Sequence, residues 1–198
     1  MLYHEHSRSL QDRYDSRRLA DRLDSFVRTA FSDEDRAFID SRAMFFLATA
    51  DAEGRPDCSY KGGLPGFVRV VGPSTLAFPS YDGNGMFLSL GNVIANPNVG
   101  LLFLDFEQPR RLRVLGRATV STEDPLMGEF EGAQLVVRVE AQKIFPNCPR
   151  YIHRMQLLEL SAYAPCEGKV PPIPAWKKFA EFNYVLPAGD PAGESAPK

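Results

Sequence analysis

The chain has 198 residues, enough for one domain with a sizeable hydrophobic core. Apolar residues make up 44% of it, and the formal net charge of -2 gives no electrostatic basis for binding nucleic acid or a membrane surface. No apolar run approaches the roughly 20 residues of a spanning helix, and the N-terminus is too charged for a signal peptide, so a cytoplasmic location is expected.

Residues 1–42 are expected to form a helical extension. From residue 9 to residue 30 the apolar side chains recur at helical spacing, which predicts one amphipathic helix. Ser32 then precedes three acidic residues, the pattern of a helix N-cap whose first turn complements the helix dipole. A second, short helix is therefore predicted to begin at this point and to end near Ser41.

From residue 43 the pattern changes to short apolar or alternating runs separated by Gly, Pro and Asp, which is typical of β-hairpins. Six or seven such runs follow, so we expect a mainly β domain over residues 43–185, built as a closed or nearly closed antiparallel barrel with flanking helices. One short helix is expected within residues 86–95, stopped by "NPN". Residues 186–198 are rich in Pro, Gly and Ala and are predicted to be disordered.

Cysteine and histidine give no sign of a disulfide framework or a metal site. Cys58, Cys148 and Cys166 are widely spaced and lack a C-x-x-C pair, so they are expected to be reduced thiols. His4 and His6 form an H-x-H near the start of the chain without a third ligand nearby. No bound metal is expected.

The segment "FPSYDGNGMFLSLGNVIANPN", which begins at Phe78, joins an apolar strand to the predicted helix through a glycine-rich turn. Glycines let a ligand approach the backbone, and the N–H groups at a helix N-terminus attract anions, so this turn outlines a phosphate site. Side chains that can add donors or positive charge there are Ser80, Asn84, Ser89, Lys61, Arg111 and Arg113. The alternative is an ordinary turn flanked by solvated arginines.

Three stretches in the same order carry a resemblance to a known family: "MFFLATADAEGRPDCSYKGG", "LAFPSYDGNGMFLSLGNVIANPNVGLLFLDF" and "RRLRVLGRATV". From residue 43 to residue 120 the chain resembles the pyridoxamine 5′-phosphate oxidase-like family of FMN-binding split barrels. The resemblance implies a six-stranded antiparallel split β-barrel, a homodimer, and FMN bound at the subunit interface. Carried over by position, the residues expected to hold the flavin phosphate are Ser59, Tyr60, Lys61, Ser80, Tyr81, Ser89, Arg111 and Arg113.

The chain departs from the family pattern at two places. The family's oxidase has Ser-Arg-Lys at the strand-to-helix turn, where this chain has "GNGMFLS", so two cationic side chains are missing. Phosphate binding would then depend on Lys61, Arg111 or Arg113 together with backbone N–H groups. The C-terminal substrate motif Arg-x-His of the oxidase is also missing, so a pyridoxine phosphate substrate is not indicated.

Three further residues are candidates for the substrate side of the flavin. Arg150 and His153 lie beside two prolines in a rigid segment that can point both side chains at a flavin edge or a substrate anion, although a surface turn is the alternative. Trp176 follows three prolines and can anchor a dimer or cover the flavin ring, the alternative being a Trp packed on its own barrel.

The residues and the resemblance together predict an FMN-dependent oxidoreductase that acts on a small organic substrate. In such proteins the cofactor carries the redox chemistry, which agrees with the lack of an obvious acid-base dyad or nucleophile. Three alternatives share the fold: a non-catalytic protein that stores or senses flavin or haem, a deazaflavin-dependent reductase, and a barrel that has lost its ligand.

Overall fold

A seven-stranded antiparallel sheet forms the centre of the structure, a computed structural model that describes residues 2–193. The strands are β1 (Met44–Ala50), β2 (Pro56–Gly62), β3 (Arg69–Val70), β4 (Thr75–Tyr81), β5 (Asn98–Asp105), β6 (Arg110–Ser121) and β7 (Ala133–Pro146). Their order in the sheet is β2-β1-β5-β6-β7-β4-β3. The predicted mainly β class is confirmed, with seven strands in place of six because the two-residue β3 adds an edge to β4.

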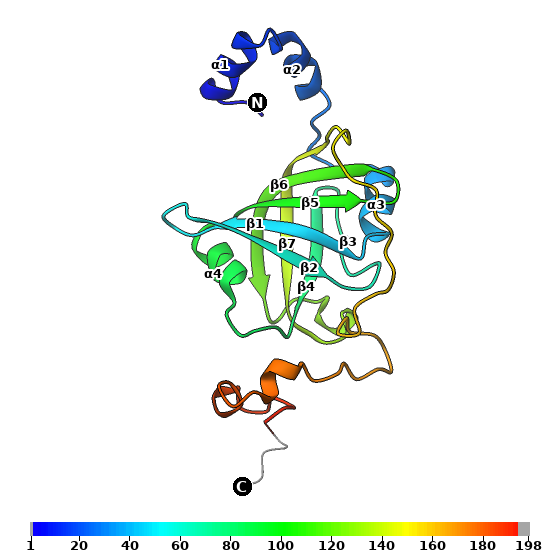
Figure 1. Cartoon of the computed structure of the whole chain (residues 1–198). Helices are drawn as coiled ribbons and strands as arrows, with labels where there is room; N and C mark the ends of the chain where they lie inside the picture. The colour runs from blue at the N-terminus through cyan, green and yellow to red at the C-terminus, as the bar shows by residue number, and fades with distance from the viewer. Residues whose placement is uncertain (1, 194–198) are drawn as a thin grey trace.

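The sheet curls into a barrel (Figure 1), and its largest cluster of buried side chains contains several phenylalanines. Phe45 of β1 and Phe78 of β4 are separated in the sheet by three strands, yet their ring centroids lie 4.9 Å apart. Phe103 and Phe67 pack on the same ring of Phe45 at 5.2 and 5.9 Å. Each such buried side chain contributes about 1.5–3 kcal/mol. The two ends of the sheet therefore approach each other as in a nearly closed barrel.

Strand β6 shows how the pleat sets the faces of the barrel. Leu112 and Val114 are buried, whereas Arg113 between them is exposed. The register of β6 with β7 shifts between Leu115 and Gly116. A side chain at Gly116 would clash with the backbone carbonyl of Glu140, so only glycine fits the bulge.

Two short helices flank the barrel. Helix α3 (Asp33–Asp40) begins at Ser32, and Ser32 and Asp35 form a reciprocal capping box, so the predicted N-cap is confirmed and the helix ends at Ser41 as expected. Helix α4 (Leu88–Ala95) falls within the helix predicted from residue 86 and lies against β1 and β6. Among residues 2–193, no helix has both the length and the apolar character needed to cross a membrane.

The first part of the chain forms two helices in place of the single predicted one. Helices α1 (Glu5–Arg13) and α2 (Arg17–Asp24) are separated at Asp15, whose φ of +50° interrupts the helix. Both lie beyond one end of the barrel in Figure 1. Apolar side chains that remain exposed here are Leu10, Tyr14, Leu19, Leu23 and Phe26.

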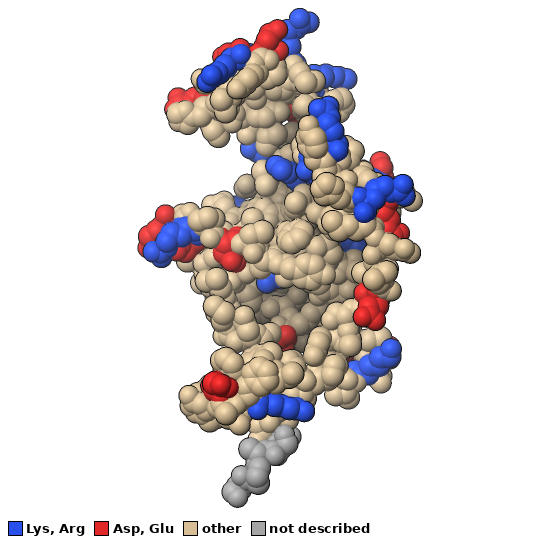
Figure 2. Space-filling model, in the orientation of Figure 1, with Lys and Arg blue, Asp and Glu red and all other residues tan. Residues whose placement is uncertain are grey.

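After β7 the chain crosses to the opposite end of the barrel without forming a further strand in the described residues (Figure 1). Its only regular elements there are two 3₁₀ turns, η2 (Ala175–Lys178) and η3 (Asn183–Val185); a third, η1 (Met127–Glu129), precedes β7. Of the tail predicted to be disordered, residues 194–198 lie outside the described residues. Figure 2 shows charged side chains mainly on the N-terminal helices and around the rim, while the middle of the barrel face is largely uncharged.

Candidate functional site

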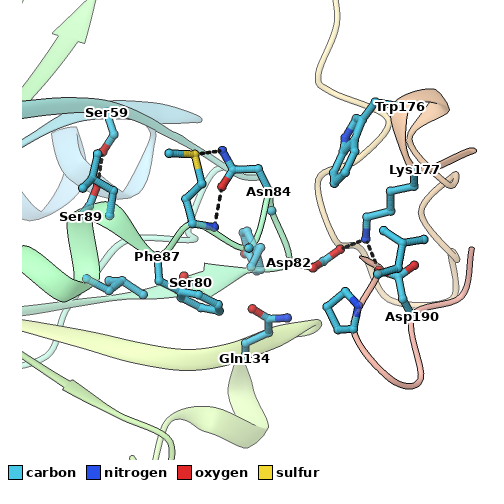
Figure 3. Close-up of a pocket in the computed structure, with 18 of the residues that line it drawn as sticks. Ser59, Ser80, Asp82, Asn84, Phe87, Ser89, Gln134, Trp176, Lys177 and Asp190 are labelled. Atoms are coloured by element: carbon cyan, nitrogen blue, oxygen red, sulfur yellow. Dashed lines mark hydrogen bonds and ion pairs between the residues drawn. The ribbon is translucent and has the colours of Figure 1, made fainter. Parts of the chain in front are cut away.

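A cavity of about 920 Å³ lies between the barrel and the C-terminal segment. Its walls come from β2, from the glycine-rich turn with the start of α4, and from residues 176–190 (Figure 3). Pockets of about 300–1,000 Å³ hold ligands the size of cofactors. The cavity is therefore large enough for a mononucleotide.

The β2 wall presents three polar side chains in a row. Asp57, Ser59 and Lys61 alternate along the strand, so they share one face, and all three are half-buried and line the cavity. At the rise of a β-strand, the Cα atoms of Asp57 and Lys61 lie roughly 13 Å apart. The wall is thus acidic at one end, neutral in the middle and cationic at the other end.

A hydrogen-bond network surrounds the acidic end of this row. Ser89 Oγ donates to Asp57 Oδ2 at 3.0 Å, and Ser59 Oγ lies 2.9 Å from Ser89 Oγ. On the other side, Asn92 donates to Thr49 Oγ1 at 3.1 Å, and Thr49 donates a longer bond of 3.5 Å to the same Asp57 oxygen. Asp57 therefore connects β1, β2 and α4.

Lys61 provides the cation at the other end. Burial lowers the pKa of the Lys61 ammonium from its usual value, and the charge of Asp57 opposes that shift only in part. Within residues 2–193 Lys61 forms no ion pair with a carboxylate. Because an anion beside a half-buried ammonium group stabilises its charged form, Lys61 is suited to bind an anionic group of a ligand.

The C-terminal segment covers the cavity through an ion cluster centred on one buried lysine (Figure 3). Lys177 is 4% exposed, and its Nζ lies 2.7 Å from both Asp82 of the glycine-rich turn and Asp190. Burial acts to lower the pKa of Lys177, but its hydrogen bonds to Asp190 and Asp82 raise the pKa above the usual value. The same lysine holds the pKa of Asp190 below its usual range. We call residues 175–190 the cover.

Apolar side chains line the part of the cavity beneath the cover. Trp176 and Phe182 contribute from the cover, with their rings in an edge-to-face contact at 5.6 Å. Met86 and Phe87 contribute from the turn before α4, Leu88 contributes as the first residue of that helix, and all three are exposed on their free side. Such surfaces suit the face of a planar aromatic ring.

The structure brings most of the predicted site residues together. Those lining the cavity are Ser59, Tyr60, Lys61, Ser80, Tyr81, Asn84, Ser89 and Trp176. Four others lie elsewhere in this structure: Arg111 and Arg113 on β6, and Arg150 and His153 in the exposed segment after β7. The Nε atom of Arg111 is buried without a hydrogen-bond partner. The binding roles of these four residues stay predictions.

Sequence reasoning missed four charged residues of the site, which are Asp57, Asp82, Lys177 and Asp190. Asp57 shares the period-two pattern of Ser59 and Lys61, so the strand alternation in "DCSYK" was a usable signal. Lys177 and Asp190 offered no such signal, because they belong to an irregular segment that pairs with the glycine-rich turn only in three dimensions.

A second cavity of about 750 Å³ adjoins the first. It lies between the barrel and residues 155–164, a segment that hydrogen-bonds through Met155 N–H to the carbonyl of Phe106. Residues that line both cavities are Tyr60, Lys61, Ser80, Tyr81 and Asp82. A molecule bound in the second cavity would therefore lie close to one bound in the first.

Comparison with known proteins gives a family match over most of the chain. Residues 31–162 match the sequence model of the family described as pyridoxamine 5′-phosphate oxidase. No curated protein matches the chain.

Solved structures with a similar arrangement include three bacterial proteins. HupZ from Group A Streptococcus is 20% identical, with 59% of this chain and 93% of that chain covered and a TM-score of 0.47. HutZ, the haem storage protein from Vibrio cholerae, is 22% identical over 59% and 94%, with a TM-score of 0.44. An FMN-binding protein from Syntrophomonas wolfei is 12% identical over 70% and 97%, with a TM-score of 0.45. Because these TM-scores lie below 0.5, these structures do not indicate which ligand this chain binds.

Proposed function

This chain belongs to the pyridoxamine 5′-phosphate oxidase family, and on that premise we propose that it is a flavoprotein that binds FMN and acts as an oxidoreductase on a small organic substrate. The observation that carries the proposal is the cavity, in which a cation, a set of hydroxyl groups and an apolar, aromatic surface face one space. A flavin nucleotide needs these three kinds of partner.

The lining residues fit the parts of FMN separately. Lys61 is the cation that can neutralise a phosphate, and Ser80 and Tyr81 beside it can donate hydrogen bonds. Trp176 and Phe87 offer apolar area on opposite sides of the cavity for the isoalloxazine ring (Figure 3). The residues present are thus compatible with the cofactor that the family implies.

When bound, the flavin would supply the hydride or electron transfer, and the protein's part is to position it and to exclude water. The cover excludes water from the cavity, because Lys177 holds it against the glycine-rich turn through a hydrogen bond to Asp82. The adjoining cavity shares Tyr60 and Tyr81 with the first, so a second molecule bound there would lie at the edge of the flavin site. Removal of water from this junction would strengthen the electrostatic contacts made there.

We also propose that the chain acts as a homodimer with the flavin near the subunit interface. The outer face of the sheet supports this, because the cross-strand row of Tyr60, Phe46, Leu102 and Arg113 combines apolar side chains with a cation on one surface. Tyr60 in this row also lines the cavity.

A matched pair of tyrosine variants tests FMN binding. Tyr60 lines the cavity and is 62% exposed, whereas Tyr151 is 83% exposed and lines neither cavity, so either can be truncated at little cost to folding. In titrations followed by quenching of flavin fluorescence, we expect Tyr60→Ala to weaken FMN binding about 10-fold, which corresponds to about 1.4 kcal/mol. Tyr151→Ala should bind FMN like the unaltered chain. Equal binding by all three proteins would contradict this placement of FMN.

Rates of flavin reoxidation separate catalysis from storage. An oxidoreductase should pass electrons from the reduced bound flavin to an acceptor faster than free FMN does. If the bound flavin is reoxidised no faster than free FMN by every acceptor tested, the chain binds flavin without acting as an oxidoreductase.

A further inference from the structure

Residues 2–26, which we call the arm, have almost no hydrophobic core of their own. No residue of α1 is buried, and α2 buries only Ala20. Polar contacts join the two helices instead, among them the ion pair of Arg8 with Asp21 at 2.6 Å. Helices of nine and eight residues are marginal in water by themselves, because most helical stability in proteins comes from packing of an apolar face. The arm therefore needs a partner that covers it.

Each helix of the arm presents an apolar face to such a partner. Leu19, Leu23 and Phe26 recur at i, i+4 and i+7 in α2 and just after it. Leu10 and Tyr14 recur at i and i+4 in α1 and at its C-cap. These five side chains, which we call the stripe, are between 48% and 71% exposed. Their area is available for burial against another surface.

The arm is anchored next to the sheet face proposed as the subunit interface. The N–H of Arg28 donates to the carbonyl of Ile144 at 2.9 Å, and the N–H of Ile144 donates to the carbonyl of Arg28 at 2.7 Å. The next residue of β7, Phe145, pairs with Arg113, which ends the cross-strand row of that face. Beyond this anchor α1 and α2 stand clear of the barrel (Figure 1), and an open recess separates them from it in Figure 2. The arm thus begins where the proposed interface ends.

The charge of the arm fits a second copy of the same chain. Residues 2–26 contain five arginines and five acidic residues, so the formal net charge of the arm is zero with the histidines neutral. A surface without net charge has no long-range attraction for nucleic acid or for anionic lipid headgroups. Two copies of it do not repel each other, and a two-fold axis brings the same surface of both copies together.

The size of a stable interface also favours participation of the arm. Such interfaces typically bury about 800 Å² on each partner and involve roughly 20–30 residues a side. The cross-strand row of four side chains on the sheet is far smaller than that. The stripe adds five large apolar side chains that are exposed in the single chain.

We propose that the arm belongs to the subunit interface, where its stripe packs on a second copy of this chain and enlarges the contact made by the sheet face. This inference rests on the proposed homodimer, not on the choice of cofactor. The arm lies before residues 31–162, the part that matches the family model, so the proposal concerns a part of the chain outside that match.

Sedimentation equilibrium of stripe variants tests the proposal. A double variant, Leu19→Gln with Leu23→Gln, removes apolar area while keeping helix propensity and adding no charge. We expect the dissociation constant of the dimer to rise about 10-fold or more. Arg18→Gln, at an exposed position of the same helix outside the stripe, is the matched control and should leave the constant unchanged. Because all three positions are exposed, the barrel should keep its thermal stability in both proteins.

Dilution of the unaltered chain provides a second readout. An arm that loses its partner should lose helix, because its helices are too short to persist alone. The helical circular dichroism signal should therefore fall on dilution in step with the fraction of monomer. A helical signal that stays constant while the dimer dissociates would contradict the proposed packing.

The remaining outcomes separate the arm from the dimer itself. An unaltered dimer whose dissociation constant is the same in the double variant would overturn the inference while the homodimer stands. A chain that is monomeric at every concentration would contradict both. Binding of a monomeric chain to vesicles of phosphatidylcholine and phosphatidylserine, lost in the double variant, would assign the stripe to a lipid surface and overturn the inference.

Discussion

The two sides of the cavity are held in place by different kinds of interaction. The β2 wall pairs with β1 over seven consecutive residues, from Met44↔Gly62 to Ala50↔Pro56, and β1 faces the aromatic core. The cover has no strand, and a single buried lysine connects it to the glycine-rich turn. The wall should therefore resist local opening better than the cover does.

This difference indicates how a ligand enters. Breaking the strand ladder would expose many backbone hydrogen bonds and the Phe45 cluster, whereas the ion pair that joins the cover to the glycine-rich turn is that of Lys177 with Asp82. The rate of ligand exchange should accordingly depend on the cover, and the orientation of the bound ligand should depend on the wall.

The largest expected effect is on the wall side. Phe45→Ala removes a fully buried ring that packs on Phe67, Phe78 and Phe103, so the free energy of unfolding should fall by about 3–5 kcal/mol. Chemical denaturation followed by circular dichroism measures the loss. Phe179→Ala, at a ring of the cover that is 52% exposed, is the control and should cost less than about 1 kcal/mol. Equal losses would mean that the cover is as much a part of the fold as the wall is.

An intermediate effect is expected from opening the cover. Lys177→Met removes the ion pair that joins the cover to Asp82 and leaves Asp190 without its buried partner, so the cover should detach while the sheet keeps its stability. Because Trp176 is the only tryptophan of the chain, its fluorescence reports on the cover directly. We expect its emission to shift and bound flavin to dissociate about 10-fold faster, a difference of about 1.4 kcal/mol. Lys178→Met, at the exposed neighbour, should do neither.

The smallest effect is a pH dependence of the same contact. The pKa of Asp190 is lowered from 3.8, so its stabilisation is complete above pH 3.8 and is lost as the pH falls through the lowered value. The pKa of Lys177 is raised from 10.5, so its stabilisation is complete below pH 10.5 and is lost as the pH rises through the raised value. Trp176 fluorescence should therefore stay constant between these limits. A transition near neutral pH would contradict this assignment.

The fold was predictable from the sequence to the extent that local patterns determine it. Ser32 followed by acidic residues correctly predicted the start of α3. The alternation of apolar and polar residues in β6 agrees with the burial of alternate side chains in that strand. The break at Asp15 was missed because a residue in the left-handed region leaves no trace in the hydrophobic period.

The site was predictable on its barrel side and not on its cover side. Ser59, Lys61 and Ser89 lie on regular elements, so their faces follow from the strand and helix periods. The pairing of Lys177 with Asp82 joins residues far apart in the sequence through irregular chain, and only the three-dimensional structure brings them together. The contacts of Asp57 with Ser89 and Thr49 likewise join three elements that only the three-dimensional structure brings together.

The most direct test of flavin binding is the visible absorption spectrum of the protein as purified, followed by denaturation and mass identification of the released molecule. The account predicts a flavin spectrum and release of FMN. A colourless, folded protein that does not take up added FMN would contradict it. Release of haem or of a deazaflavin would contradict the choice of FMN and would identify the cavity's ligand instead.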